Sequence, residues 1–310
     1  MAIEQAAGQN RRDVLKLAGV LTASMMAGAF SWPLRAAEAH APRRKVLFFT
    51  KSSGYQHSVI KRNKDDELSY AEQILGDLGK RHGYDVTATK DGRYFTPERL
   101  AEFDAAVFYT TGDLTTPGLD QQPPMPKDGP ETLIKWVESG KGFLGLHSAD
   151  DTFLTEVDKD LHDIGPIHPY IKMLGGEFNK HGKQQNARIL AKETSFGPIQ
   201  GLKDFELFEE WYKVKNLSPD LHVILVQDTQ SMPADEYKQL KPYPQTWARM
   251  QGRGRVFYTS LAHREETWKM PLFENILLGA LAWTTGNADA DVTPNLLKVN
   301  PEAAVYLRKE

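Results

Sequence analysis

The chain has 310 residues, of which 40% are hydrophobic and 25% are charged, with 24 glycines and 18 prolines. These proportions are those of a globular protein and exclude a disordered, fibrous or multispan membrane protein. The formal net charge of −3 provides no overall positive field for nucleic acid or an anionic membrane. The absence of cysteine excludes disulfides, cysteine-ligated zinc, iron–sulfur clusters and thiol nucleophiles.

The first 39 residues have the pattern of an export signal. Arg11 and Arg12 precede an apolar run over residues 17–30, and Ala37-Glu38-Ala39 then supplies a small-x-small cleavage pattern. A membrane anchor is the alternative, but the run is shorter than the roughly 20 residues that a bilayer span needs. We therefore expect a twin-arginine signal peptide over 1–39, a periplasmic or secreted protein, and no membrane span after cleavage.

Strand and helix patterns then alternate. Residues 45–50 form a continuous apolar run, which is typical of a parallel strand covered on both faces. Apolar residues recur at helical spacing over 64–82, and Gly83 is placed to end that helix. Further short strands are predicted over 85–89, 105–109 and 142–146, with a helix over 131–138. This order predicts an open parallel sheet with helices on both faces and ligands beyond the carboxyl ends of its strands.

The second half of the chain is less regular. Strand patterns occupy residues 187–191, 205–214, 221–226 and 255–260, and a helix pattern occupies 271–284. We interpret these elements as an insertion followed by completion of the sheet. The sequence thus predicts one domain over residues 40–286 and a C-terminal tail over 287–310.

Histidines are concentrated where such a sheet places its ligand crevice. His57, His147 and His263 each follow a predicted strand, and His181 follows Gly175-Gly176. Imidazole is a general base or a metal ligand near neutral pH. A single histidine is more often structural, but three at strand ends indicate a shared site. We expect His57, His147 and His263 to converge in one crevice.

The segment around His147 is similar to the nucleophile elbow G-x-S-x-G, but His147 occupies the position of the nucleophile and Ala149 that of the last glycine. Ser148 is displaced by one residue from the apex of such a turn. A serine hydrolase with Ser148 as its nucleophile is therefore a minor alternative, and a helix cap is the simpler role for this hydroxyl.

Carboxylates near the histidines could complete the site. Asp150 and Asp151 follow His147 and could ligate a metal, orient an imidazole or cap a helix, and we favour Asp150. Glu209 and Glu210 lie on one predicted strand, so their side chains should point to opposite faces, and one of them can enter the crevice while the other meets solvent. Neighbouring aromatic residues could stack on a sugar or pack in the core, namely Trp211, Tyr212 and Trp247.

Phosphate and dinucleotide sites have no support in the sequence. The turn after the first strand, residues 51–55, is neither G-x-G-x-x-G nor a Walker loop, and the glycines at 252 and 254 precede a strand instead of following one.

Four separated segments resemble the ThuA-like (trehalose utilisation) family. They are residues 54–57, 145–150, 175–181 and 252–263, and the resemblance covers about residues 45–283. It implies a flavodoxin-like, class I glutamine-amidotransferase-like three-layer sandwich with a mainly parallel central sheet, and a connection with sugar catabolism. His147 stands where that superfamily ordinarily has its cysteine, which excludes glutaminase activity. Ala262 stands where the family more often has a glycine before its last histidine.

From these observations we expect an exported enzyme that acts on a disaccharide, glycoside or keto-sugar, with no nucleic-acid partner. His57, His147 and His263 would surround a divalent metal or act as acid and base. Zinc is favoured because imidazole nitrogens suit it and no thiolate is present. Glu210 is a further catalytic candidate, and Asp150 and His181 are further candidate metal ligands. The alternative is a non-catalytic carbohydrate-binding or interaction domain on the same fold.

Overall fold

The computed structural model describes residues 43–64, 66–119, 121–159, 162–194 and 196–309, which belong to one compact unit. The predicted signal peptide over 1–39 lies outside the described residues. Within the described part of the chain, every helix is too short or too polar to cross a bilayer.

Nine strands form the larger sheet. In spatial order they are β2 (Tyr84–Thr89), β1 (Arg44–Phe49), β3 (Ala105–Phe108), β4 (Gly142–Leu146), β11 (Gly254–Thr259), β10 (Tyr243–Gln251), β9 (His222–Asp228), β6 (Gln185–Ala191) and β7 (Phe205–Glu209). A separate two-stranded antiparallel ribbon pairs β5 (Glu177–His181) with β8 (Tyr212–Lys215).

Strand direction divides the larger sheet into two parts. The strands from β2 to β11 are mutually parallel, whereas β10, β9, β6 and β7 are joined by antiparallel pairings. Because two successive antiparallel pairings restore the original direction, β9 and β7 again run with the parallel strands. Seven of the nine strands therefore point the same way, and the expected mainly parallel central sheet is confirmed.

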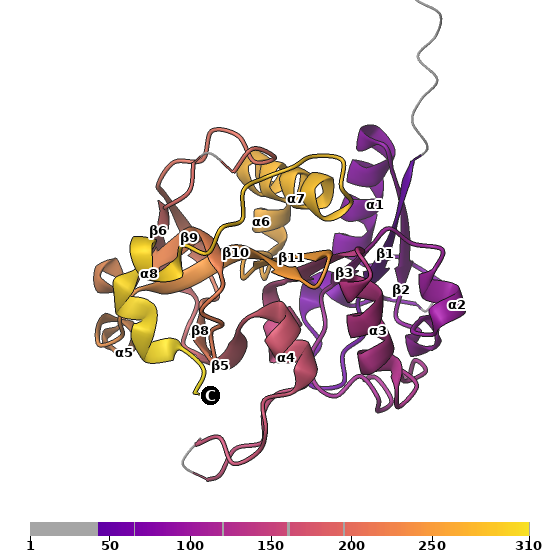
Figure 1. Ribbon diagram of the computed structural model, residues 1–310, viewed down its shortest axis with the longest axis horizontal. Coiled ribbons are helices and arrows are strands. Elements are labelled where there is room, and N and C mark those ends of the chain that lie inside the picture. Colours follow the sequence, from indigo (N-terminus) through magenta and orange to yellow (C-terminus); the bar gives the residue numbers. More distant parts are fainter. Residues whose placement is uncertain (1–42, 65, 120, 160–161, 195, 310) are drawn as a thin grey trace, which may run out of the picture. The chain divides into compact units, whose positions relative to one another are not determined.

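Helices cover both faces of this sheet, as Figure 1 shows for α1, α6 and α7 on one face and α3 and α4 on the other. The helices are α1 (Tyr70–His82), α2 (Pro97–Leu100), α3 (Gly129–Glu138), α4 (Pro169–Leu174), α5 (Asp235–Lys238), α6 (Glu265–Trp268), α7 (Pro271–Thr284) and α8 (Leu296–Val299). Shorter 3₁₀ segments are η1 (Ser58–Ile60), η2 (Gly92–Tyr94), η3 (His147–Asp151), η4 (Thr229–Ser231) and η5 (Pro301–Tyr306).

The continuous apolar sequence of β1 explains this layering. Its side chains alternate between faces, so Val46 and Phe48 join the core beneath α1 and α7, while Leu47 and Phe49 join the core beneath α3 and α4. All four side chains are fully buried. The predicted three-layer α/β sandwich is confirmed.

The first long helix begins later than the apolar spacing predicts. Its start is set by a capping box, in which the Ser69 hydroxyl accepts a hydrogen bond from the backbone N–H of Glu72 and the Glu72 carboxylate accepts one from that of Ser69. The helix ends at Gly83, whose φ of 84° favours glycine.

The strand expected over residues 205–214 is two strands, and this correction bears on the site. β7 ends at Glu209 in the larger sheet, and β8 begins at Tyr212 in the ribbon. A strand pattern cannot reveal such a corner, because both parts keep extended backbones. The predicted tail is described as far as residue 309, where α8 and η5 bury Leu296 and Ala303 against the core.

Candidate functional site

Three of the predicted histidines meet at one edge of the parallel sheet. His147 follows β4 directly, while His57 and His263 lie in the segments that follow β1 and β11. These strands are parallel and close together in the sheet, so their carboxyl ends share an edge. His57, His147, His263 and Glu210 each offer one ligand atom, and these atoms all lie within 4.8 Å of one another. We refer to these four residues as the histidine–glutamate group.

The backbone at His147 has the turn that the elbow-like sequence predicts. Its φ is 44°, which is rare for a residue with a side chain and directs the imidazole out of the strand. Nδ1 of His147 lies 2.8 Å from the carbonyl oxygen of Ser260, an acceptor only, so Nδ1 carries the proton. Nε2 is buried without a hydrogen-bond partner. Nε2 of His147 therefore points into the group.

The imidazoles of His57 and His263 are kept neutral by their surroundings. Burial lowers the pKa of His57 far below its usual range, and the neighbouring His147 and His263 lower it further. Burial likewise lowers the pKa of His263 to about 4, again with a contribution from His147. Both side chains are thus uncharged at neutral pH, which is the form that binds metals.

Glu210 supplies the negative charge of the group. Its Oε2 lies 3.5 Å from Nε2 of His147, 3.5 Å from Nε2 of His263 and 4.0 Å from Nε2 of His57. Burial opposes ionisation of this carboxyl, but the contacts with His147 and then His263 prevail and lower the pKa of Glu210. The group therefore combines two neutral imidazoles, those of His57 and His263, with the imidazole of His147 and the carboxylate of Glu210, a set of donors that suits a divalent cation.

The adjacent Glu209 holds the segment that carries His263. Its Oε1 accepts hydrogen bonds from the backbone N–H groups of Ala262, His263 and Arg264, at 3.2, 2.8 and 3.3 Å. The Thr267 hydroxyl donates to the same oxygen. Ala262 has a φ of 102°, where a glycine would be unstrained. Glu209 thus stabilises a backbone conformation that Ala262 alone disfavours. Glu210 is the glutamate that reaches the histidines, but the expectation that the other glutamate meets solvent is wrong, because Glu209 is fully buried and accepts these backbone hydrogen bonds.

Two predicted metal ligands lie outside the group. The Asp150 carboxyl is fully buried beside Tyr258, and burial raises its pKa well above the usual range. His181 lies at the rim, where its Nδ1 is 3.3 Å from Oε1 of Glu210 and its side chain is 45% exposed. Asp150 is therefore not part of the histidine–glutamate group, whereas His181 borders that group from the solvent side.

The remaining candidates have structural surroundings. Ser148 is completely buried, with its Oγ unpartnered and out of reach of a substrate. Trp211 and Trp247 are also buried, and their ring N–H groups donate to the carbonyl oxygens of Gln185 and Leu174. Neither indole is available to stack on a sugar.

Three residues beside the group deserve more weight than the sequence pattern gives them. The pattern does not identify Tyr109, it offers Tyr212 only as a residue that could stack on a sugar, and it ranks Asp151 below Asp150. Tyr109 ends β3's apolar run, and its ring contacts those of His57 and His147 at centroid distances of 5.5 and 5.7 Å. The Tyr212 hydroxyl lies 3.3 Å from Nε2 of His57. Burial raises the pKa of Asp151 to about 7, and this effect exceeds the opposite effect of the neighbouring His147 and His181, which lower the pKa. The position of Tyr109 at a strand end could have identified it by the rule that identified the histidines.

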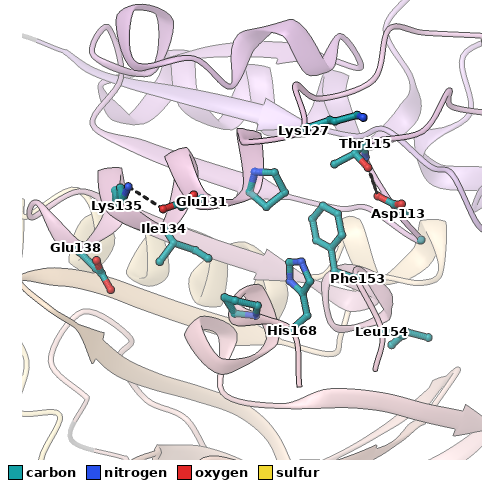
Figure 2. A pocket seen from close by; sticks show the side chains of 13 residues that line it. Asp113, Thr115, Lys127, Glu131, Ile134, Lys135, Glu138, Phe153, Leu154 and His168 are labelled. Carbon is teal, nitrogen blue, oxygen red and sulfur yellow. Dashed lines mark hydrogen bonds and ion pairs between the residues drawn. The ribbon is translucent and has the colours of Figure 1, made fainter. Parts of the chain in front are cut away.

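A separate cavity of about 880 Å³ lies between α3, α4 and the loop after β3. Figure 2 shows Glu131, Ile134 and Lys135 of α3 on one side of it and Phe153 and His168 on the other. The rings of Phe153 and His168 stack with centroids 4.6 Å apart. No member of the histidine–glutamate group lines this cavity, so the predicted chemistry does not lie there.

The lowered histidine pKa values predict acid-sensitive stability of the metal-free protein. As the pH falls from about 6.5 towards 5, the unfolded chain binds protons at His57 and His263 while the folded chain does not. Proton binding at these two histidines should therefore lower the free energy of unfolding as the pH falls across this window, by on the order of 1–3 kcal/mol, while proton uptake by Asp151 in the folded chain, whose pKa is raised to about 7, acts in the opposite direction. Urea unfolding at several pH values measures the change. The contribution of His263 is the difference in slope between the wild type and His263→Asn, which should lose less stability as the pH falls, and the exposed His162→Asn should match the wild type. Equal slopes for His263→Asn and the wild type contradict the prediction.

Comparisons with known proteins agree with this architecture. A family model described as ThuA, trehalose utilisation, matches residues 45–284. A ThuA-like protein from Bacteroides uniformis ATCC 8492 is 21% identical, with a TM-score of 0.60 over 81% of this chain and 94% of that one. A second ThuA-like protein, from Parabacteroides merdae ATCC 43184, is 14% identical, with a TM-score of 0.54 over 81% and 92% of the two chains. At these identities the two structures establish the fold alone. No curated protein matches the chain.

Proposed function

The chain belongs to the ThuA family, and on that premise we propose that it is a metal-dependent enzyme acting on a disaccharide, glycoside or keto-sugar. The family, described by trehalose utilisation, supports a role connected with sugars. The proposal of a metal rests on the convergence of three imidazoles and one carboxylate, whose ligand atoms lie within 4.8 Å of one another.

Two of the distances within the group suit a shared ion better than hydrogen bonds, while the 4.0 Å between Glu210 and His57 is longer than both. The separations of 3.5 and 3.5 Å between Glu210 and the imidazoles of His147 and His263 exceed the usual hydrogen-bond range of about 2.7–3.2 Å. Ligands about 2.0–2.1 Å from a tetrahedral zinc ion lie roughly 3.3–3.4 Å from one another. The donor set of nitrogen and oxygen atoms also suits zinc.

The unpartnered Nε2 of His147 adds support because other ligand atoms lie around it, unlike that of His222 on β9, which is equally unpartnered. Buried polar atoms are nearly always hydrogen-bonded, and a buried nitrogen without a partner is costly. Nε2 of His147 is such an atom. Its opposite nitrogen is fixed by the Ser260 carbonyl, which is the arrangement usual for a metal-ligating histidine. A bound cation would satisfy the buried nitrogen.

In this proposal a bound zinc ion would act as a Lewis acid on a sugar oxygen or a water molecule. The chain's own residues supply orientation and proton transfer. His181 is the most exposed imidazole at the rim, so it is placed to contact the substrate. Asp151, with its pKa raised to about 7, can hold or release a proton near neutral pH.

The deciding experiment measures zinc content and turnover together. Purified mature protein is analysed for metal and assayed on a panel of disaccharides and their keto forms, before and after chelation and after zinc is restored. We expect about one zinc ion per chain and activity that is lost and regained with it. Full activity of the metal-free protein would refute the proposal that activity depends on a metal. Sugar binding without turnover on any member of the panel would favour the non-catalytic carbohydrate-binding domain.

We also propose that the protein is exported by the twin-arginine route, on the basis of Arg11, Arg12 and the apolar run that follows. Replacing both arginines by lysine should stop export, as measured by cell fractionation. Normal export of the double variant would show that this assignment is wrong.

A further inference from the structure

The ribbon of β5 and β8 has two chemically different faces. His181 pairs with Tyr212 across the ribbon, and Lys180 pairs with Lys213. Directly paired residues share a face, and neighbours along a strand point to opposite faces. Tyr212 faces the histidine–glutamate group, where its ring centroid is 4.4 Å from that of His147. The lysines therefore lie on the face turned away from the group.

A groove of about 1000 Å³ lies on this second face. Its walls are the ribbon, the segment over residues 162–167 and the C-terminal segment over 305–309, and Figure 1 shows the end of the described chain beside β5 and β8. The C-terminal segment is fixed there, because the backbone of Leu217 accepts a hydrogen bond from Arg308 and donates one to Tyr306. We call this feature the basic groove.

The charge of the basic groove is opposite to that of the whole chain. Its lining contains one carboxylate, that of Asp163, and six cationic side chains, those of Lys172, Lys180, Lys213, Lys215, Arg308 and Lys309. The chain as a whole carries a formal charge of −3. Positive side chains gathered in a groove repel one another and focus the electrostatic potential on whatever enters it.

Internal ion pairs neutralise only part of this charge. Lys213 pairs with Glu236 at 2.8 Å, and Lys215 pairs with Asp163 and with Glu177. Among the residues that the structure describes, no ion pair is formed by the other four cationic side chains, which are those of Lys172, Lys180, Arg308 and Lys309. An anion in the groove would relieve their mutual repulsion, and the Arg308 guanidinium can bind two oxygens of one phosphate or carboxylate.

The groove also offers apolar surface and hydrogen-bonding groups. Ile167, Val214, Leu240 and the ring of Tyr306 line it beside the amide of Asn179. An aromatic ring with adjacent amides suits the C–H face and the hydroxyl groups of a sugar. We propose that the basic groove is a second ligand site, separate from the histidine–glutamate group, that binds an anionic carbohydrate, either a sugar phosphate or a uronate.

Calorimetric titration of the full chain tests this proposal with three probes: glucose 6-phosphate, digalacturonate and neutral glucose. At low ionic strength we expect at least one of the anionic sugars to saturate one site with an affinity at least about tenfold above that of glucose. Added salt should weaken this binding, because the contacts are electrostatic. The anionic probe that binds more tightly identifies the phosphate or the uronate as the preferred charge.

Paired variants locate the site. Lys180→Ala with Arg308→Ala should lower the affinity at least about tenfold, because two charge-assisted contacts are lost. Lys127→Ala with Lys298→Ala removes equal charge outside the groove and should change the affinity by less than about twofold. All of these side chains lie at the surface, and thermal unfolding checks that each variant is folded.

The proposal is overturned if neither anionic sugar saturates a site, if glucose binds as tightly, or if the two double variants behave alike. Repeating the titration on chelated protein separates this site from the metal. Because the groove and the histidine–glutamate group lie on opposite faces of the ribbon, chelation should leave the affinity unchanged. Loss of binding on chelation would show that the anionic sugar binds at the metal, and it would refute the proposal that the basic groove is the binding site.

Discussion

Replacement of His147 by alanine is expected to lower bound zinc from about one ion per chain to nearly none and turnover by at least about a hundredfold. The reason is geometric. His147 is fully buried, its Nδ1 is engaged by the Ser260 carbonyl, and its Nε2 points at Glu210 from 3.5 Å. Metal analysis and turnover of the purified variant measure both effects.

The positive φ of His147 requires a second variant. Alanine at a φ of 44° carries a strain of about 1 kcal/mol, whereas asparagine tolerates this conformation better. His147→Asn should therefore lose zinc and activity like His147→Ala but retain more of its free energy of unfolding. If both variants keep their zinc, His147 is not a ligand.

His222 offers a matched control for this experiment. Like His147 it is buried, its Nδ1 lies 2.8 Å from a backbone carbonyl, that of Thr293, and its Nε2 has no hydrogen-bond partner. It lies on β9, away from the group. His222→Ala should cost stability through the loss of packing and leave zinc content unchanged. Equal zinc loss in the His147 and His222 variants would indicate a general effect of cavity formation.

Replacement of Glu209 by glutamine is expected to weaken zinc binding by about 10–100-fold, although Glu209 is not itself a ligand. The carboxyl oxygen that now accepts three consecutive backbone N–H groups becomes an amide oxygen, and the buried Oε2 position becomes an N–H₂ group without an acceptor. The segment at Ala262 then loses part of the hydrogen bonding that holds its strained backbone, and His263 is less firmly placed. Competition with a chelating dye measures the zinc affinity.

Glu177 is the control for Glu209. Its carboxylate is also fully buried, and it accepts hydrogen bonds from the backbone and hydroxyl of Thr155 and from the amide of Asn216. Glu177→Gln should destabilise the fold by a similar amount, about 1–3 kcal/mol, and leave the zinc affinity within about twofold. Should Glu209→Gln bind zinc like the wild type, the role of Glu209 is confined to stability.

Much of the fold could be predicted because its signals are local. The apolar run of β1 and the helical spacing of α7 each encode an element within a few neighbouring residues. The start of α1 was misplaced because its capping box at Ser69 and Glu72 fixes the boundary more strongly than the apolar spacing does. The corner between β7 and β8 was missed because it depends on which sheet each half joins.

The site was predictable to the extent that strand ends define it. His57, His147 and His263 all follow parallel strands, so topology alone brings them together. The sequence pattern favours Asp150 over Asp151, but η3 turns successive side chains in different directions, and packing alone decides that Asp150 is buried beside Tyr258 while Asp151 lies near His147 and His181. The hydrogen bonds that Glu209 accepts from the backbone around His263 could not be predicted, because they join segments more than fifty residues apart in the chain.

The pairing of β11 with β4 has a consequence for the order of folding. Residues 147–253 separate these two neighbouring strands in the chain, so their contact closes a long loop and forms slowly. Until β11 joins, β4 leaves an unpaired parallel edge that can associate with other chains, and His263 is not near His147. A nascent chain therefore has an incomplete histidine–glutamate group before its last sheet strand is made, and the proposed zinc ion would find all four residues together only after the sheet has closed.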